Sequence, residues 1–217
     1  MSPLSKTENK VLMTQARESL RGKWGLAAGT SFVYVIILAF LQVIPVLGWI
    51  ASTVIAGPMM IGLTLFMLSI SRKQNVALPQ IFDGFQKFSV GFGAYCLMGL
   101  FVLLWALLLI VPGIIAALSY SLTYFIIVDD GSIRPLQAIT KSKEMMQGNK
   151  WKLFCLFFRF FGWALLCILT CGIGLFWLIP YIMVSTAKFY DEIKIQQDGG
   201  FIAPQPTPTV DVSGFIS

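Results

Sequence analysis

The sequence predicts an all-α, polytopic membrane protein with six transmembrane helices, arranged as three tandem helical hairpins that are each preceded by an interfacial amphipathic helix. Composition supports this class, because 57% of the 217 residues are hydrophobic and only 12% are charged, whereas soluble domains carry about 25% charged residues. Long apolar runs support it as well, since a helix needs about 20 predominantly apolar residues to cross a bilayer. The distribution of basic residues over the connections is the third supporting observation.

The apolar runs come in pairs, and a turn that contains Gly or Pro separates the two runs of each pair. The runs are 26–44 and 49–70, then 90–111 and 114–128, and finally 153 to about 189 with an interruption at Gly172 and Gly174. The fourth run is short for a span, so we expect it to continue into neighbouring residues.

Polar connections precede each pair of runs, and their apolar residues recur at helical spacing. In the first connection Leu12, Ala16 and Leu20 share one helical face beside basic residues. Amphipathic helices of this kind lie on a membrane surface. The predicted organisation is therefore an N-terminal cytoplasmic amphipathic segment at 1–25, a transmembrane domain at 26–195 and a disordered cytoplasmic tail at 196–217.

Two polar segments share a sequence pattern, which predicts an internal repeat. Residues 17–24 read RESLRGKW and residues 143–151 read KEMMQGNKW, with one residue inserted; a weaker copy contains Gly84, Lys87 and Phe88. Each copy leads into a pair of apolar runs. Three tandem hairpins fit this pattern better than six unrelated spans.

The basic residues predict the orientation of the chain. All of them except Arg159 lie in the N-terminal lead-in, in the connections after the second and fourth runs, or after the sixth, and the turns at 45–48, 112–113 and 171–174 carry no charge. Because basic connections stay on the cytoplasmic side, both termini are expected in the cytoplasm.

The third copy also carries motifs of a known family. The strings GNKWKLF, FGWALL, LTCGIGLFWLIPY and STAKFYDE resemble the bacterial integral-membrane family called domain of unknown function 975, which is similar to the membrane domain attached to some glycerophosphodiester phosphodiesterases. The resemblance covers about residues 10–195. It implies a multi-pass protein of the bacterial cytoplasmic (inner) membrane, and it brings no catalytic residues to this chain.

Arg159 is the one ionisable residue well inside an apolar run. A charge at such a depth costs a few kcal/mol unless it is paired or reaches the surface. The favoured interpretation is that its long side chain extends to the phosphate headgroups. The alternative is that it faces the bundle interior and binds an anionic headgroup or a substrate carboxylate.

Pro58 and Pro180 lie inside the second runs of the first and third copies, where they predict helix breaks. Freed backbone carbonyls at such breaks coordinate ions or substrate in some transporters. Because Pro is common in membrane helices, a purely structural kink is the favoured interpretation.

Basic and aromatic residues stand together at the entry to two hairpins: Lys23 with Trp24, and Lys150 and Lys152 around Trp151. Basic groups beside a membrane span are attracted to anionic lipid by about 1 kcal/mol each, and tryptophan rings favour the headgroup level. We therefore predict lipid binding there. Nucleic acid is not expected as a partner, because membrane topology already explains the positive charge.

No residue pattern predicts a reaction, a cofactor or a metal. The chain has no His and four Cys that all lie in apolar runs, so a metal site would lack its usual further ligands. The carboxylates fall at the predicted span ends, without a nucleophile elbow or phosphate-binding glycine loop. The chain is therefore expected not to be an enzyme.

The predicted function is that of a non-enzymatic integral membrane protein, a scaffold or accessory to a membrane machine or to membrane organisation, whose basic interfacial helices contact anionic lipid. Another membrane protein or a second copy of the chain is the further partner that this function allows. The alternative is a transporter or channel for a small molecule, lipid or ion that uses Arg159 and the proline-containing helices. A conducting path needs more polar lining than this sequence offers.

Overall fold

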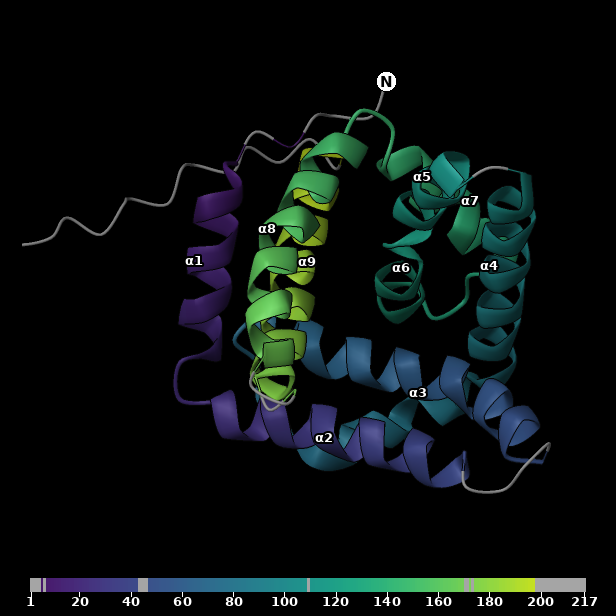
Figure 1. Ribbon diagram of the computed structural model, residues 1–217, viewed down its shortest axis with the longest axis horizontal. Coiled ribbons are helices and arrows are strands. Elements are labelled where there is room, and N and C mark those ends of the chain that lie inside the picture. The colour runs from purple at the N-terminus through teal and green to yellow at the C-terminus, as the bar shows by residue number, and fades with distance from the viewer. Residues whose placement is uncertain are drawn as a thin grey trace, which may run out of the picture.

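The computed structural model describes residues 5, 7–42, 47–108, 110–169, 172 and 174–197, and every regular element in this part of the chain is helical (Figure 1). The elements are α1 (Asn9–Leu20), α2 (Trp24–Leu41), α3 (Leu47–Ser71), η1 (Leu78–Lys87), α4 (Phe88–Leu108), α5 (Ile110–Tyr120), α6 (Thr123–Asp129), α7 (Pro135–Met145), α8 (Lys150–Leu169) and α9 (Leu175–Gln197). Of these, η1 is a 3₁₀ helix. The predicted all-α class is confirmed. The predicted tail lies outside the described residues, apart from its first two, which end α9.

Several helices are long and apolar enough to cross a membrane. Among the described residues, four segments qualify: Trp24–Leu41, Ala51–Ser71, Leu78–Leu107 and Val111–Asp129. The chain is therefore a multi-pass membrane protein by the length and composition of its helices. Neither α8, which carries Arg159 and two lysines, nor α9, which is charged over its last turns, is among the four. The fifth and sixth predicted spans stay predictions.

Helix α3 is the centre of the fold. Within an apolar window of 18 residues, 72% of the residues are buried in Ala51–Ser71, against 11% in Leu78–Leu107, so the first window is a core element and the second faces mostly outward. The helix contacts α1, α2, α4, α6, α9 and η1. Such an element is apolar all round, and α3 accordingly buries Met59 and Phe66 on one side and Ile61 and Leu68 on the opposite side.

Glycines allow α3 to approach η1 and α4 at backbone distance. A Cβ atom added to Gly84 would lie 2.0 Å from the Pro58 carbonyl oxygen and 2.6 Å from the Gly62 backbone nitrogen. One added to Gly57 would lie 2.4 Å from the Gly91 carbonyl oxygen. Small residues at membrane helix interfaces permit this close contact, and here the contact lies within one chain.

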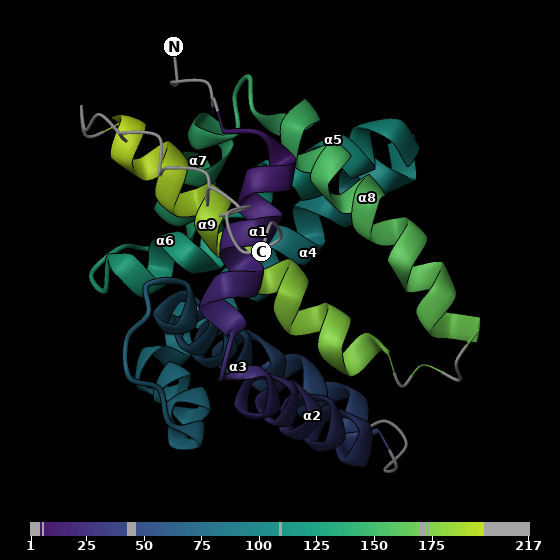
Figure 2. The ribbon, with the colours of Figure 1, turned by 90° about the vertical axis from the view of Figure 1, so that its left-hand side faces the viewer.

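The connections predicted to be amphipathic do form helices, but α1 and α7 use most of their apolar residues inside the protein. In α1, Leu12, Ala16 and Leu20 are buried, and α1 packs across α9 (Figure 2). The prediction that this apolar stripe faces the membrane was wrong, because other helices cover it. In η1, by contrast, Phe82 and Phe85 remain exposed.

Two glycines close the same kind of turn at different places in the chain. Gly22 lies between α1 and α2 with φ +80°, and Gly148 lies between α7 and α8 with φ +81°. The next residue donates its backbone N–H to a helix-end carbonyl in both turns, Lys23 to Leu20 at 2.9 Å and Asn149 to Met146 at 3.2 Å. The left-handed region is readily accessible only to glycine.

The helix interruption lies elsewhere than predicted. Pro58 and Pro180 are buried inside α3 and α9, which continue through them. The break separates α5 from α6 at residues 121–122, in the copy that has Ser119 and Tyr120 where the other copies have Pro58 and Pro180. Predicting helix breaks at the two prolines was therefore wrong, since packed neighbouring helices support a helix through proline.

A hydroxyl group from α7 occupies this interruption. Ser142 Oγ donates a hydrogen bond to the Ser119 carbonyl oxygen at 2.8 Å and accepts one from the Leu122 backbone N–H at 3.3 Å. Ser142 is fully buried, so water does not compete for these groups. The side chain thus satisfies a donor and an acceptor that a continuous helix would have paired.

Replacing Ser142 with Ala is expected to destabilise the protein by about 2 kcal/mol, because two buried backbone groups lose their partner. Thermal unfolding in detergent micelles would measure the loss. Thr140→Val on the same helix is the control, since the Thr140 hydroxyl is exposed and bonds only within α7. Equal stabilities of the two variants would contradict this account of the interruption.

Candidate functional site

Three helices bring oppositely charged side chains together at their ends. We call Arg72, Asp129, Tyr190, Asp191 and Lys194 the charged junction. Arg72 donates from Nη1 and Nη2 to the two Asp129 oxygens at 2.8 and 2.9 Å, and Nη2 also reaches Asp191 Oδ1 at 2.7 Å. Asp129 Oδ2 further accepts from Lys194 Nζ at 2.6 Å and from the Tyr190 hydroxyl at 3.0 Å.

The members of the charged junction lie at or near the C-terminal ends of their helices. Arg72 directly follows the last residue of α3, Asp129 is the last residue of α6, and the other members lie on α9. Lys73 then turns the chain away with φ 58°. Lysines from other elements cap the same helix ends: Lys188 donates to the Ser71 carbonyl oxygen, and Lys87 to that of Ile127 at 3.0 Å. Cations are favourable at helix C-termini.

The charges of the junction compensate one another. Two acids face two bases, and the Arg72–Asp129 pair has the bidentate geometry that makes such hydrogen bonds strong. Hydrogen bonding to Asp129 raises the pKa of Arg72. Burial opposes this effect, but Asp191 also raises the pKa, so the net change is an increase. Because each of these groups already has a partner, the junction suits a structural tie between three helices better than an open binding site.

A second cluster holds the start of the chain against α8 and α9. The Glu192 carboxylate is 4% exposed, and it accepts hydrogen bonds from Ser5 Oγ at 2.5 Å and from the Thr7 backbone N–H at 2.7 Å. Lys152 Nζ lies 3.4 Å from Glu192 Oε2. Burial lowers the pKa of Lys152, and Glu192 raises it part of the way back.

The structure separates the residues that were predicted to bind lipid. Lys152 turns inward to Glu192, and Lys23 Nζ donates to the Gln74 carbonyl oxygen at 2.6 Å. Both therefore serve contacts within the protein, which corrects the expectation that they point to lipid. Lys150 and Trp24 are half-buried, and the Trp24 ring lies 6.1 Å from that of Tyr181.

Trp151 lies on the outer surface of α8, and its predicted role in lipid binding stays a prediction. It is 74% exposed and begins a row of stacked rings along the outside of α8. Successive ring centroids from Trp151 through Phe154 and Phe158 to Phe161 lie 5.4, 6.2 and 6.4 Å apart. An exposed aromatic row is typical of a surface that contacts lipid.

Arg159 lies on the outside of α8. Leu153, Leu156 and Phe160 form the buried face of this helix, whereas the Arg159 side chain is exposed. The interpretation that Arg159 faces the bundle interior was therefore wrong. The spacing of the three buried residues puts Arg159 at the border of the outward apolar face.

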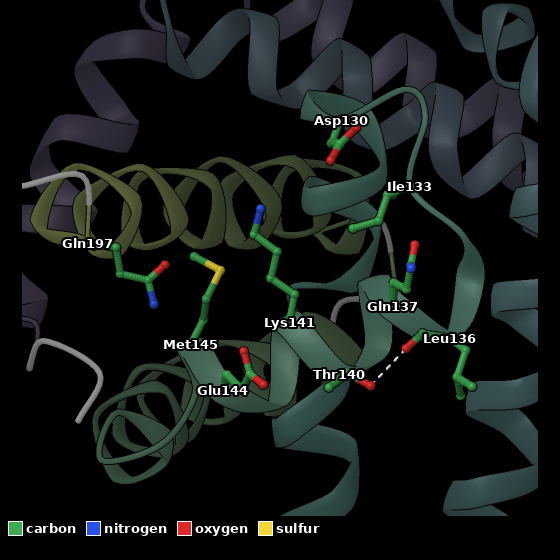
Figure 3. Close-up of a pocket in the computed structure, with 9 residues that line it drawn as sticks. All are labelled: Asp130, Ile133, Leu136, Gln137, Thr140, Lys141, Glu144, Met145 and Gln197. Atoms are coloured by element: carbon green, nitrogen blue, oxygen red, sulfur yellow. Dashed lines mark hydrogen bonds between the residues drawn. The ribbon is translucent and has the colours of Figure 1, made fainter.

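The described residues also form an open hollow of about 570 Å³ (Figure 3). Its side chains come from the connection after α6, from α7 and from the end of α9, and they mix charged, amide and apolar groups: Asp130, Ile133, Leu136, Gln137, Thr140, Lys141, Glu144, Met145 and Gln197. It contains neither the charged junction nor any predicted site residue. Its mixed lining does not indicate one class of ligand.

The sequence prediction did not include the charged junction. From the sequence, Asp129 and Asp191 are polar residues at the ends of spans, and Arg72 is a basic residue that indicates the cytoplasmic side. A signal did exist, because charged residues follow the second apolar run of each copy: basic ones in the first copy, acidic ones in the second and both kinds in the third. Only the fold brings Arg72 to Asp191, which lies 119 residues further along the chain.

A comparison with protein families gives one match. The sequence model described as "Protein of unknown function (DUF975)" matches residues 1–119 and 107–197, which together cover most of the chain. Neither a curated protein nor a solved structure matches it. The family match confirms the resemblance seen in the third copy, and the description assigns no activity.

Proposed function

The chain belongs to the DUF975 family of proteins of unknown function, and we propose that it is a non-enzymatic membrane scaffold or accessory protein. In this proposal six spans form three hairpins in the bacterial cytoplasmic membrane, both termini are cytoplasmic, and the basic cytoplasmic surface contacts anionic lipid. A membrane protein partner, or a second copy of the chain, is assembled on this framework. Nucleic acid has no part in it.

The packing of the helices supports three hairpins. Helix α2 contacts α3, α4 contacts α5, and α8 contacts α9. In Figure 2 the C-terminal ends of α2 and α8 and the N-terminal ends of α3 and α9 lie toward the right, whereas the C-terminal end of α9 and the helices α6 and α7 lie toward the left. Charged residues at the left-hand ends suit a cytoplasmic face.

The surface of α8 supports a fifth crossing. Phe158, Phe161, Trp163, Leu165 and Leu166 are all exposed, and water would be an unfavourable neighbour for so continuous an apolar face. The matching turns at Gly22 and Gly148 support the internal repeat.

The observation that carries the proposal is that the carboxylates at the helix ends pair with basic side chains. Asp129, Asp191 and Glu192 each have a basic partner from another part of the chain, Arg72 at the end of α3 for the first two and Lys152 on α8 for the third. Such pairing holds helices in register and leaves these carboxylates poorly placed for acid–base catalysis. The Pro58 carbonyl, which a transporter could have used, is covered by the backbone at Gly84.

The alternative is a transporter for a small molecule, lipid or ion. The buried interruption between α5 and α6 favours it, because broken helices form sites in many transporters. Ser142 fills that interruption, however, and pairs the freed backbone groups. We therefore prefer the scaffold.

Extraction of the protein with its native membrane into lipid nanodiscs, followed by mass spectrometry of all bound proteins and lipids, would test the proposal. We expect a second membrane protein in stoichiometric amount, together with anionic lipid. Recovery of the protein alone, combined with solute flux in reconstituted liposomes, would overturn the scaffold and support the transporter.

A further inference from the structure

Arg159 lies at the edge of an apolar surface without a partner from the protein. Phe158 and Trp163 on either side of it in sequence are 67% and 62% exposed. Within the part of the chain that the structure describes, the Arg159 guanidinium has no hydrogen-bond acceptor and no carboxylate within reach. A cation that borders lipid in this way is costly unless an anion accompanies it.

A second arginine approaches the same place from α1. Arg17 is exposed, and it too has no hydrogen-bond or ionic partner among the described residues. Arg17 lies one helical turn after Met13, whose carbonyl oxygen accepts a hydrogen bond from Tyr181 on α9, and Arg159 directly precedes Phe160, whose ring contacts that of Tyr181. The helices that carry them are neighbours, since α1 contacts both α8 and α9.

Contacts from three helices hold Tyr181 in place. Its hydroxyl donates to the Met13 carbonyl oxygen at 3.2 Å, and its ring contacts Phe160 at 5.1 Å and Trp24 at 6.1 Å between centroids. Tyrosine and tryptophan rings of this kind favour the boundary between headgroups and acyl chains. Guanidinium groups beside such rings are suited to the level of the lipid phosphates.

We propose that Arg17 and Arg159 together bind the phosphate of an anionic lipid headgroup above Tyr181. Guanidinium groups match phosphate oxygens with paired hydrogen bonds, and the two positive charges balance a headgroup that carries one or two negative charges. The exposed aromatic row of α8 offers an apolar surface to the acyl chains. This inference rests on the proposed membrane insertion, and it names the lipid site within that function.

The test uses the full-length protein in nanodiscs of phosphatidylcholine that contain a minority of phosphatidylglycerol, with the retained lipids measured by native mass spectrometry. Arg17→Gln and Arg159→Gln should each weaken phosphatidylglycerol binding about tenfold, because each removes charge-assisted hydrogen bonds. The double variant should lose little more than either single variant, since both arginines hold one phosphate. Lys141→Gln is the control, because it removes an exposed charge on α7.

Equal losses in Lys141→Gln would overturn the site and indicate general attraction to the positive surface. Unchanged binding in both arginine variants would overturn it as well. Competition by inorganic phosphate at the concentration of the lipid would assign the site to a free anion. If the protein enters nanodiscs but these variants bind normally, only this inference fails; if it does not enter them, the proposed membrane function fails.

Discussion

Asp129→Asn should lower the free energy of unfolding by about 2–4 kcal/mol, because the Asp129 carboxylate is the centre of the charged junction. It accepts four hydrogen bonds, two from Arg72, one from Lys194 and one from Tyr190, and it is 11% exposed. An amide of the same shape has one oxygen, and its NH₂ group would face donors. The ends of α3, α6 and α9 would then lose their common acceptor.

Unfolding by heat or by sodium dodecyl sulfate in mixed micelles would measure this effect. Asp130→Asn is the matched control, since the neighbouring carboxylate accepts hydrogen bonds only from Ser132, and little change is expected there. A double-mutant cycle of Asp129→Asn with Arg72→Gln should give a large coupling energy, because the two residues act through each other. Additive losses would contradict the junction.

Gly84→Ala is expected to cost about 3 kcal/mol or to prevent folding, because overpacking at this position cannot be relieved by a side-chain rotation. The new Cβ would lie 2.0 Å from the Pro58 carbonyl oxygen and 2.6 Å from the Gly62 nitrogen. Both are backbone atoms of α3, so η1 would have to move away from the central helix. Yield of monodisperse protein and thermal stability in detergent would reveal the separation.

The control for this variant is Gly99→Ala in α4, where an added Cβ meets no atom within 4 Å. Alanine is the better helix former, so this change should be neutral or raise stability by up to about 1 kcal/mol. Comparable losses at both positions would show that the close approach of α3 and η1 contributes little.

The sequence predicted the helices well because apolar runs and helical spacing are local properties. It could also identify that Leu12, Ala16 and Leu20 share a face of α1. Periodicity does not reveal what covers such a face, however, and here α9 rather than the membrane does so. For the same reason, the sequence could not show that Lys152 points inward, because its partner Glu192 lies on another helix.

Features that depend on tertiary contacts could not be predicted from the sequence. Prolines were the obvious candidates for helix breaks, yet the break near Ser121 depends on the Ser142 hydroxyl, which arrives from α7. The charged junction likewise needs three helix ends to meet. For Arg159, the sequence shows that the residue is isolated in an apolar run. It does not show that the side chain points outward, because this depends on how α8 packs.

The central claim is that three helical hairpins cross the membrane and that the polar connections before and between them all lie on its cytoplasmic side. Labelling with a membrane-impermeant maleimide on intact cells tests it most directly. One variant keeps Cys171 as its single thiol, in the predicted turn outside the described residues, and a second adds Asn75→Cys to a cysteine-free chain. We predict labelling of Cys171 from outside, and labelling at position 75, in the exposed connection after α3, only after the membrane is opened. Labelling of both positions from the same side would contradict the account.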